Sequence, residues 1–203
     1  MLMGMPSETA PPTGPTYIWR DTFTDADSTA LSAHTPNTSP GGIGYTNSSG
    51  MSITSNQCVM TGSGSYFGAY GDAGVADCTI EIDGIYGSGA STDWSVIFRV
   101  QDSSNYWFLR VVYIVGNFAE IQLYSVVGGS QSMVTQDVTF TAPGVGTGHV
   151  TITLSGSSIS CRATQVSGRD LVCSTTSSTF STNTKHGWGG NSGSLVWDNY
   201  TIQ

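Results

Sequence analysis

Apolar and polar residues alternate along two neighbouring segments in the middle of the chain, residues 94–101 and 106–113. The polar tetrapeptide between them, residues 102–105, is typical of a hairpin loop, so we predict two antiparallel strands. The loop places Gln101 opposite Tyr106 and Phe98 opposite Leu109. One face of this hairpin is then continuously apolar and is predicted to face the core: Trp94, Val96, Phe98, Val100, Trp107, Leu109, Val111 and Tyr113.

The opposite face of the hairpin and of the next predicted strand is mixed in character. It carries aromatic, basic and amide side chains: Arg99, Tyr106, Phe108, Arg110, Gln122 and Tyr124. Rings that stack on sugars, with Arg and Gln bonding hydroxyls, would make this face a lectin-like groove. The alternative is a second core layer or a subunit interface, where Tyr, Phe and Arg are also enriched.

The rest of the chain repeats the strand pattern. About a dozen short apolar segments separated by turns lie between residues 17 and 202, and no helical pattern exceeds one turn. This predicts an all-β antiparallel sandwich in one domain, residues 17–203. Residues 1–16 differ, because they have no periodic apolar pattern and contain Pro6, Pro11, Pro12 and Pro15. They predict an extended arm of polyproline-II character, held by its own domain or, as we favour, by neighbouring subunits.

Charge excludes several classes of partner. The net charge is −8, with one lysine and five arginines, so there is no basic surface for nucleic acid or for an anionic membrane. No apolar run reaches the ~20 residues of a membrane helix. The N-terminus lacks the basic and apolar regions of a secretory signal. We therefore expect synthesis in a host cytoplasm and display on a virion exterior; the alternative is a secreted protein whose signal has been removed.

Three separated blocks of sequence carry a family resemblance: DTFTDADSTALSAHTP, VIFRVQDSSNYWFLRV and HGWGGNSGSLVWDNYTI. They resemble the concanavalin A-like lectin/glucanase jelly roll, and within it the laminin-G-like domains of bacteriophage virion proteins. The resemblance implies two stacked antiparallel sheets with the first and last strands side by side. Asp21 and Asp198 would then be neighbours, and relatives often hold a structural calcium near the chain ends, with Asp25 and Asp27 as further ligands. The alternative is that Asp21 and Asp198 accept turn amides.

The sequence predicts no enzyme. Laminarinase-type relatives carry Glu-x-Asp-x-x-Glu on one strand, and here Glu81 and Asp83 are followed by Tyr86 in place of the last acid. Retaining hydrolysis needs two carboxyl groups about 5–5.5 Å apart, so we expect Glu81 and Asp83 to lie on the outer face of a strand. The chain's histidines have no metal-ligand spacing, and we expect His34 and His186 to bond local backbone groups.

Four cysteines, Cys58, Cys78, Cys161 and Cys173, allow three pairings. Cys161 and Cys173 flank a short turn and are predicted to face each other on the core side of two strands. They form either a cross-strand disulfide or two buried thiols, and Cys58 with Cys78 presents the same choice.

These observations predict a capsid decoration or minor capsid protein of a tailed phage. Its arm would bind grooves between major capsid protein subunits, with neighbouring copies of itself as further partners and structural calcium as the one cofactor considered. The alternative function is a carbohydrate-binding module or tail-associated adhesin that recognises host surface glycans through the mixed face.

Overall fold

A computed structural model describes residues 16–61, 64–86, 92–114, 118–140, 146–164, 169–191 and 195–203, of which the side chain of Tyr86 is not described. Within these ranges the chain forms strands and two short 3-10 helices, η1 (Leu31–Ala33) and η2 (Pro40–Gly42). None of the helices in these described ranges is long and apolar enough to span a membrane. The strands are β1 (Trp19–Asp21), β2 (Met51–Thr54), β3 (Gln57–Met60), β4 (Ala69–Asp72), β5 (Cys78–Tyr86), β6 (Thr92–Asp102), β7 (Asn105–Ile114), β8 (Phe118–Val127), β9 (Ser130–Thr139), β10 (Gly146–Ser155), β11 (Ser158–Thr164), β12 (Leu171–Thr176), β13 (Lys185–Gly190) and β14 (Leu195–Ile202).

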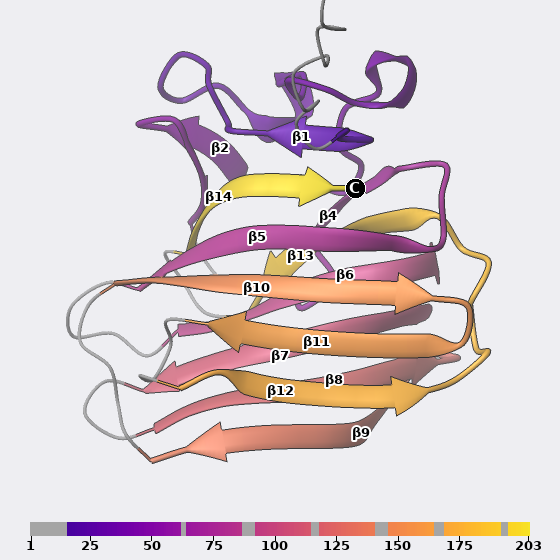
Figure 1. The fold of residues 1–203 in the computed structure, drawn as a ribbon. Coiled ribbons are helices and arrows are strands. Elements are labelled where there is room, and N and C mark those ends of the chain that lie inside the picture. Colours follow the sequence, from indigo (N-terminus) through magenta and orange to yellow (C-terminus); the bar gives the residue numbers. More distant parts are fainter. Residues whose placement is uncertain are drawn as a thin grey trace, which may run out of the picture.

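The strands stack as two antiparallel sheets (Figure 1). Sheet A has the order β12-β11-β10-β5-β14-β3-β2, with β1 paired to β14, and sheet B has the order β4-β13-β6-β7-β8-β9. The predicted all-β sandwich is therefore confirmed. The first and last strands do lie side by side, with Trp19 opposite Ile202. At the far edge β9 and β12 lie next to each other (bottom of Figure 1).

The core lies between the sheets and is built by strand alternation. On β5, Ile80 and Ile82 are fully buried, while Glu81 and Asp83, which alternate with them, are partly exposed. All five tryptophans are also buried there: Trp19, Trp94, Trp107, Trp188 and Trp197. Burying large apolar side chains contributes about 1.5–3 kcal/mol each. The alternation of apolar and polar residues thus indicates which face of a strand is buried in the core and which faces solvent.

The central hairpin departs from the predicted register. The turn pairs Asp102 with Asn105, but further along the strands Phe98 pairs with Trp107. Three residues on β6 therefore oppose the single residue Tyr106 on β7, which is a β-bulge. Beyond it, Val96 pairs with Leu109 and Trp94 with Val111, so the predicted partners Leu109 for Phe98 and Val111 for Val96 are wrong by two positions. A shift of two preserves the faces, and seven of the eight predicted core residues lie in the core.

The exception is at the bulge itself. Val100 packs on the outer face of sheet B with Ile97 and Phe108 instead of between the sheets. Arg99 has φ of 50°, in the left-handed region that non-glycine residues seldom adopt. The bulge turns the backbone over and exchanges the faces of these two side chains.

Candidate ligand-binding surface

The segment between β3 and β4 brings two aromatic side chains, Tyr66 and Phe67, onto the outer face of sheet B. Its backbone is fixed to the sheet: the Gly190 amide donates to the Ser65 carbonyl at 2.9 Å, and the Ser95 hydroxyl donates to the Tyr66 carbonyl at 2.7 Å. These two bonds hold the segment against β13 and β6.

The aromatic rings on this face form a stack. Phe108 lies between Tyr66 and Tyr124, with ring centroids 5.3 and 4.8 Å away and ring planes within 15° and 4° of parallel. Phe67 lies against Tyr106, with ring centroids 4.9 Å apart and ring planes tilted by 53°. Phe108 and Tyr106 are consequently buried, at 0% and 3% exposure. Tyr66 and Tyr124, at the two ends of the stack, are partly exposed, and so is Phe67.

Beside the ring stack lies a network of charged and polar side chains centred on Arg110. Its Nε and Nη2 donate to the two carboxylate oxygens of Asp93 at 2.8 and 2.7 Å, and its Nη1 donates to Gln122 Oε1 at 2.9 Å. The hydroxyl of Tyr66 donates to Asp93 Oδ2 at 2.7 Å, and that of Tyr124 donates to Gln122 Oε1 at 3.1 Å. The arrangement joins the polar network to the ring stack.

Neither Arg110 nor Tyr66 changes its charge over the neutral pH range. The two hydrogen bonds that Arg110 donates to Asp93 raise the already high pKa of Arg110. Burial, together with the bond to Asp93, raises the pKa of Tyr66 to about 12. The Arg110 guanidinium also lies over the Tyr66 ring, 5.4 Å from its centroid, a cation–π contact. Gln122 is fixed on its other side, because its Nε2 donates to Glu120 Oε1 at 2.9 Å.

We call Tyr66, Asp93, Arg110, Glu120, Gln122 and Tyr124 together the Arg110 surface. The side chains of Arg110 and Asp93 remain 27% and 20% exposed. The surface therefore presents preorganised hydrogen-bonding groups and the edges of two aromatic rings to solvent.

Five of the six residues predicted for the mixed face lie on this outer face of sheet B: Tyr106, Phe108, Arg110, Gln122 and Tyr124. Two of them, Tyr106 and Phe108, are covered rings and not open platforms. Sequence reasoning missed Tyr66, Asp93 and Glu120. Strand alternation places Asp93 and Glu120 on this face, so the sequence pattern could have predicted them. Tyr66 lies outside any strand, so no periodic pattern indicates its position.

The sixth residue, Arg99, is not on the mixed face, and this prediction is wrong. Its side chain is fully buried, and its Nη2 donates to the Gly156 carbonyl at 2.6 Å in the β10–β11 turn of sheet A. It also contacts Asp77 Oδ1 at 3.4 Å. The bulge in β6 is the cause, because the left-handed backbone at Arg99 reverses the direction of the side chain.

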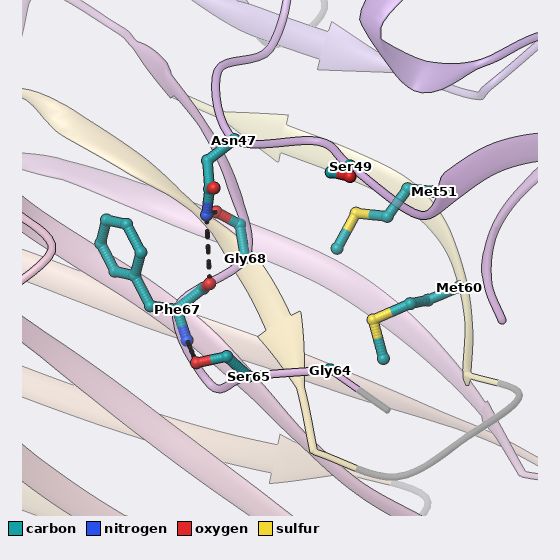
Figure 2. Close-up of a pocket in the computed structure, with 8 residues that line it drawn as sticks. All are labelled: Asn47, Ser49, Met51, Met60, Gly64, Ser65, Phe67 and Gly68. Atoms are coloured by element: carbon teal, nitrogen blue, oxygen red, sulfur yellow. Dashed lines mark hydrogen bonds between the residues drawn. The ribbon is translucent and has the colours of Figure 1, made fainter. Parts of the chain in front are cut away.

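A pocket of about 340 Å³ adjoins the Arg110 surface, where residues 64–68 pass the start of β2. Figure 2 shows Met51 and Met60 lying side by side as its apolar wall, and these two residues are paired across β2 and β3. Asn47 closes another side and donates from Nδ2 to the Phe67 and Gly68 carbonyls at 3.2 and 2.9 Å. The amide side chain that shapes the pocket thus also holds Phe67 in place.

On the outer face of sheet A, Glu81 and Asp83 lie where the sequence placed them. His149 on β10 bridges them, with Nδ1 2.8 Å from Asp83 Oδ1 and Nε2 3.7 Å from Glu81 Oε1. Although burial alone raises the pKa of Asp83, hydrogen bonds from His149 and Asn199 hold it below its usual value. Asp83 is thus an ionised partner of His149, the opposite of a carboxyl that retains a proton for general-acid catalysis.

Asp21 has a structural role in the loop after β1. The fully buried carboxylate accepts hydrogen bonds from His34 Nε2 at 2.9 Å, from the Tyr45 hydroxyl at 2.8 Å and from the Phe23 amide at 2.8 Å. The expectation that the His34 ring bonds a backbone group is wrong, since its other nitrogen lies 3.3 Å from Asp25 Oδ2.

Asp198 has a separate set of partners from Asp21. It pairs with Asp83 across β14 and β5, and its Oδ1 accepts the Asn199 amide at 2.7 Å. Burial raises the pKa of Asp198. Among the described residues, no group of three or more His, Cys, Asp or Glu side chains is placed to hold a metal ion. Calcium binding through Asp21 and Asp198 stays a prediction, and the geometry of Asp21 agrees with the alternative in which it accepts a turn amide.

All four cysteines are buried free thiols, the second of the two states considered. Cys161 does pair with Cys173 across β11 and β12. Cys78 Sγ lies 3.7 Å from His186 Nε2, a contact that invites comparison with a catalytic dyad.

The Cys78–His186 contact does not activate the thiol. His186 Nε2 is 3.0 Å from the Val75 carbonyl and must carry the proton, while Nδ1 accepts the Arg99 amide at 3.3 Å. No lone pair is left to take the thiol proton. Burial raises the pKa of Cys78 to about 12 and lowers that of His186 to about 4. His186 does bond backbone groups, but Val75 and Arg99 are distant in sequence, so the expectation of a local partner is wrong.

The predicted arm, with Pro6, Pro11, Pro12 and Pro15, lies outside the described residues, which begin at Thr16. The mechanism of capsid attachment that depends on it stays a prediction.

No known family model matches this sequence, and no curated protein matches it. Solved structures do match the fold. The carbohydrate-binding module CBM66 from Bacillus subtilis is 14% identical, with a TM-score of 0.51 over 95% of this chain and 99% of that one. The CBM2 module of the evolved Dit of Lactobacillus casei BL23 phage J-1 is 10% identical, with a TM-score of 0.55 over 92% of this chain and 94% of that one.

A laminarinase from Flavobacterium sp. UMI-01 also matches, at 9% identity and a TM-score of 0.51, over 92% of this chain and 99% of that one. At these identities the likenesses show the fold alone. The chain is a jelly-roll β-sandwich of the kind found in carbohydrate-binding modules and in glycosidases, which agrees with a concanavalin A-like fold.

Proposed function

We propose that this domain binds carbohydrate through the Arg110 surface, without catalysis. The observation that carries the proposal is the bonded network Tyr66–Asp93–Arg110–Gln122–Tyr124 on one open face of sheet B. Sugar hydroxyls both donate and accept hydrogen bonds, so they need acceptors and donors side by side. Asp93 and Gln122 supply the acceptors, and the remaining N–H groups of Arg110 supply the donors.

Preorganisation supports the same function. Each polar side chain of the surface is held by another before any ligand arrives, which lowers the entropy lost on binding. The partly exposed rings of Tyr66 and Tyr124 offer apolar area beside those polar groups, the combination that suits a sugar ring with one apolar face. The fold's occurrence in carbohydrate-binding modules of a bacterium and of a phage is consistent with this function.

The absence of catalysis is part of the proposal. A retaining glycosidase requires one carboxyl group that keeps a proton and one ionised nucleophile. Asp83 has its pKa lowered and is bonded to His149 and Asn199, and the strand has Tyr86 where laminarinase-type relatives have the further acid. We expect that incubation with a bound glycan releases no reducing ends.

A glycan array followed by calorimetric titration tests the proposal. Arg110→Ala should abolish binding of the glycan selected on the array, because it removes the centre of the network. Arg162→Ala is the matched control, since Arg162 pairs with Asp170 on the exposed side of β11. Equal affinity of the two variants, or no hit on a broad array, would refute the proposal. Intrinsic tryptophan emission is a poor reporter, because all five tryptophans are buried.

A second candidate function is that of a virion protein, and the likeness to a phage Dit module favours it. A phage adhesin would use the same Arg110 surface on host glycans. Capsid decoration would instead use residues 1–16 to bind the major capsid protein. Co-sedimentation with undecorated capsids, with and without residues 2–15, separates the two: arm-dependent binding supports decoration, and no binding of either protein contradicts it.

A further inference from the structure

The guanidinium of Arg99 is buried without a full set of hydrogen bonds. Its side chain has 0% exposure, and only Nη2 is bonded, to the Gly156 carbonyl and more weakly to Asp77. Within the described part of the chain, Nε and Nη1 have no partner. Buried polar groups are satisfied in the great majority of cases, and a buried charge still more so. A purely structural arginine would not be expected to leave two nitrogens unpaired.

The backbone at Arg99 also adopts an unfavourable conformation. Its φ of 50° lies in the left-handed region, which costs a non-glycine residue about 1 kcal/mol or more. Strain and an unsatisfied charge at the same residue are typical of a functional site.

A pocket of about 560 Å³ lies beside Asp77 and Gly156, the two residues that Arg99 Nη2 contacts. We call it the Arg99 pocket, and its lining residues are Val75, Ala76, Asp77, Gly156, Ser181 and Thr182. Both acceptors of Arg99 Nη2 belong to this lining, so the charged end of the side chain reaches the pocket wall. The volume falls within the 300–1,000 Å³ typical of small-molecule sites.

Asp77 stands between the guanidinium and solvent. Its side chain is 56% exposed, and its Oδ1 is 3.4 Å from Arg99 Nη2, well beyond the 2.7–2.9 Å of a strong charged pair. Its other oxygen accepts the Gly156 amide at 2.8 Å. The contact between Asp77 and Arg99 is therefore weak, and rotation of one exposed side chain is enough to release it.

We propose that the Arg99 pocket binds a small organic acid through its carboxylate group. One carboxylate oxygen bonds the unpaired Nη1, and the other takes the place of Asp77 Oδ1 on Nη2, which together form the two-pronged pairing that guanidinium groups favour. The hydroxyls of Ser181 and Thr182 then face the ligand's polar groups, and Val75 and Ala76 face its carbon skeleton. A sugar acid such as a uronate matches this combination of an anionic, a hydroxyl-rich and an apolar part.

D-glucuronate and D-glucose form a matched pair of probes, because they differ only by the carboxylate. We expect NMR titration of the full chain to show glucuronate binding at least tenfold tighter than glucose, with the largest shifts at Gly156 and Ser181. Asp77→Asn keeps the bond to the Gly156 amide and removes the competing charge, so it should tighten glucuronate binding at least threefold. Arg99→Gln should abolish it, and Arg162→Gln, at an exposed arginine, should leave it unchanged.

The outcomes decide the proposal even if Arg99→Gln fails to fold. Equal binding of glucuronate and glucose, both to the wild-type chain and to Asp77→Asn, would overturn it. Binding of inorganic phosphate in place of glucuronate would overturn the assignment of a carboxylate. The pocket is independent of the proposed glycan surface, so Arg110→Ala should bind glucuronate as the wild-type chain does.

Discussion

Arg110 and Arg99 lie on neighbouring strands of sheet B and have opposite environments. Arg110 on β7 is partly exposed, and its Nε, Nη1 and Nη2 each donate to Asp93 or Gln122. Arg99 on β6 is fully buried, and among the described residues only one of its guanidinium nitrogens has a partner. Simple strand alternation would place both on one face, and the bulge at Arg99 separates them.

The difference shows how one local irregularity creates two kinds of site. The regular part of the sheet forms a surface whose polar groups are hydrogen-bonded to one another. Such a surface suits an uncharged ligand that both donates and accepts hydrogen bonds. The bulge places an incompletely paired cation at the end of the sandwich, next to a pocket. Four predictions test this contrast, in decreasing order of expected effect.

The largest expected effect is a loss of folding stability at acid pH. It depends on His186, which stabilises the bulge by accepting a hydrogen bond from the Arg99 amide. Burial lowers the pKa of His186 from 6.5 to about 4, so the unfolded chain binds a proton in this range that the folded chain does not. The contribution of neutral His186 to the free energy of unfolding is fully present above pH 6.5. It falls by on the order of 3 kcal/mol as the pH falls to 4.

Urea unfolding of the wild-type chain and of His186→Gln at pH 7 and pH 4 measures this contribution. Carboxylates with lowered pKa values, including Asp72 and Asp137, act in both proteins, so the difference between them isolates His186. An equal loss of stability in both would contradict the account. The Arg110–Tyr66 pair does not titrate in this interval, because both pKa values are raised.

Arg110→Met should lower the free energy of unfolding by about 2 kcal/mol, since it removes charged hydrogen bonds from a partly buried site and leaves Asp93 with fewer donors. Glycan binding should fall at least tenfold in the same variant. Arg162→Met provides the comparison, and its exposed pair with Asp170 should contribute less than about 0.5 kcal/mol. Similar losses in the two variants would show that the network is not stabilising.

Arg99→Met should stabilise the protein, whereas Arg110→Met should destabilise it. An apolar side chain of similar length needs no hydrogen bonds, and replacement of an incompletely satisfied buried charge is often stabilising. We expect the free energy of unfolding to rise by about 1 kcal/mol, measured by urea denaturation at pH 7. A loss of more than about 1 kcal/mol would mean that the guanidinium is structural and would remove the basis for a site at the bulge.

The smallest effect is expected for Tyr124→Phe. The ring stack on Phe108 remains, and only the hydroxyl bond to Gln122 is lost. Calorimetric titration should show glycan binding weakened two- to fivefold, about 0.5–1 kcal/mol. Tyr17→Phe, at the partly exposed Tyr17 whose ring lies under Arg20, should leave affinity unchanged.

Much of the fold follows from the sequence because the core depends on alternation. Ile80, Ile82 and the hairpin residues Leu109 and Val111 are buried as their period of two requires. The hairpin register was two positions off, because no residue pattern distinguishes Arg99-Val100-Gln101 as a bulge from three ordinary strand residues. Bulges depend on the tertiary partners that stabilise them, here His186 and Gly156.

The candidate site was predictable only where it lies on strands. Arg110, Gln122 and Tyr124 alternate with core residues and were found. Tyr66 reaches the surface from an irregular segment held by Ser95 and Gly190, so its position depends on contacts remote in sequence. Its presence changes the nature of the site, because it covers the ring of Phe108 that the sequence suggested would be open.

The decisive measurement of where the glycan binds is the mapping of amide chemical-shift changes during titration with the tightest glycan from the array. We expect the largest changes on outer-face residues 108–112 of β7 and 120–124 of β8, and at Tyr66. We also expect them to vanish in Arg110→Ala. Changes confined to the outer face of sheet A, around Glu81 and His149, would contradict the account.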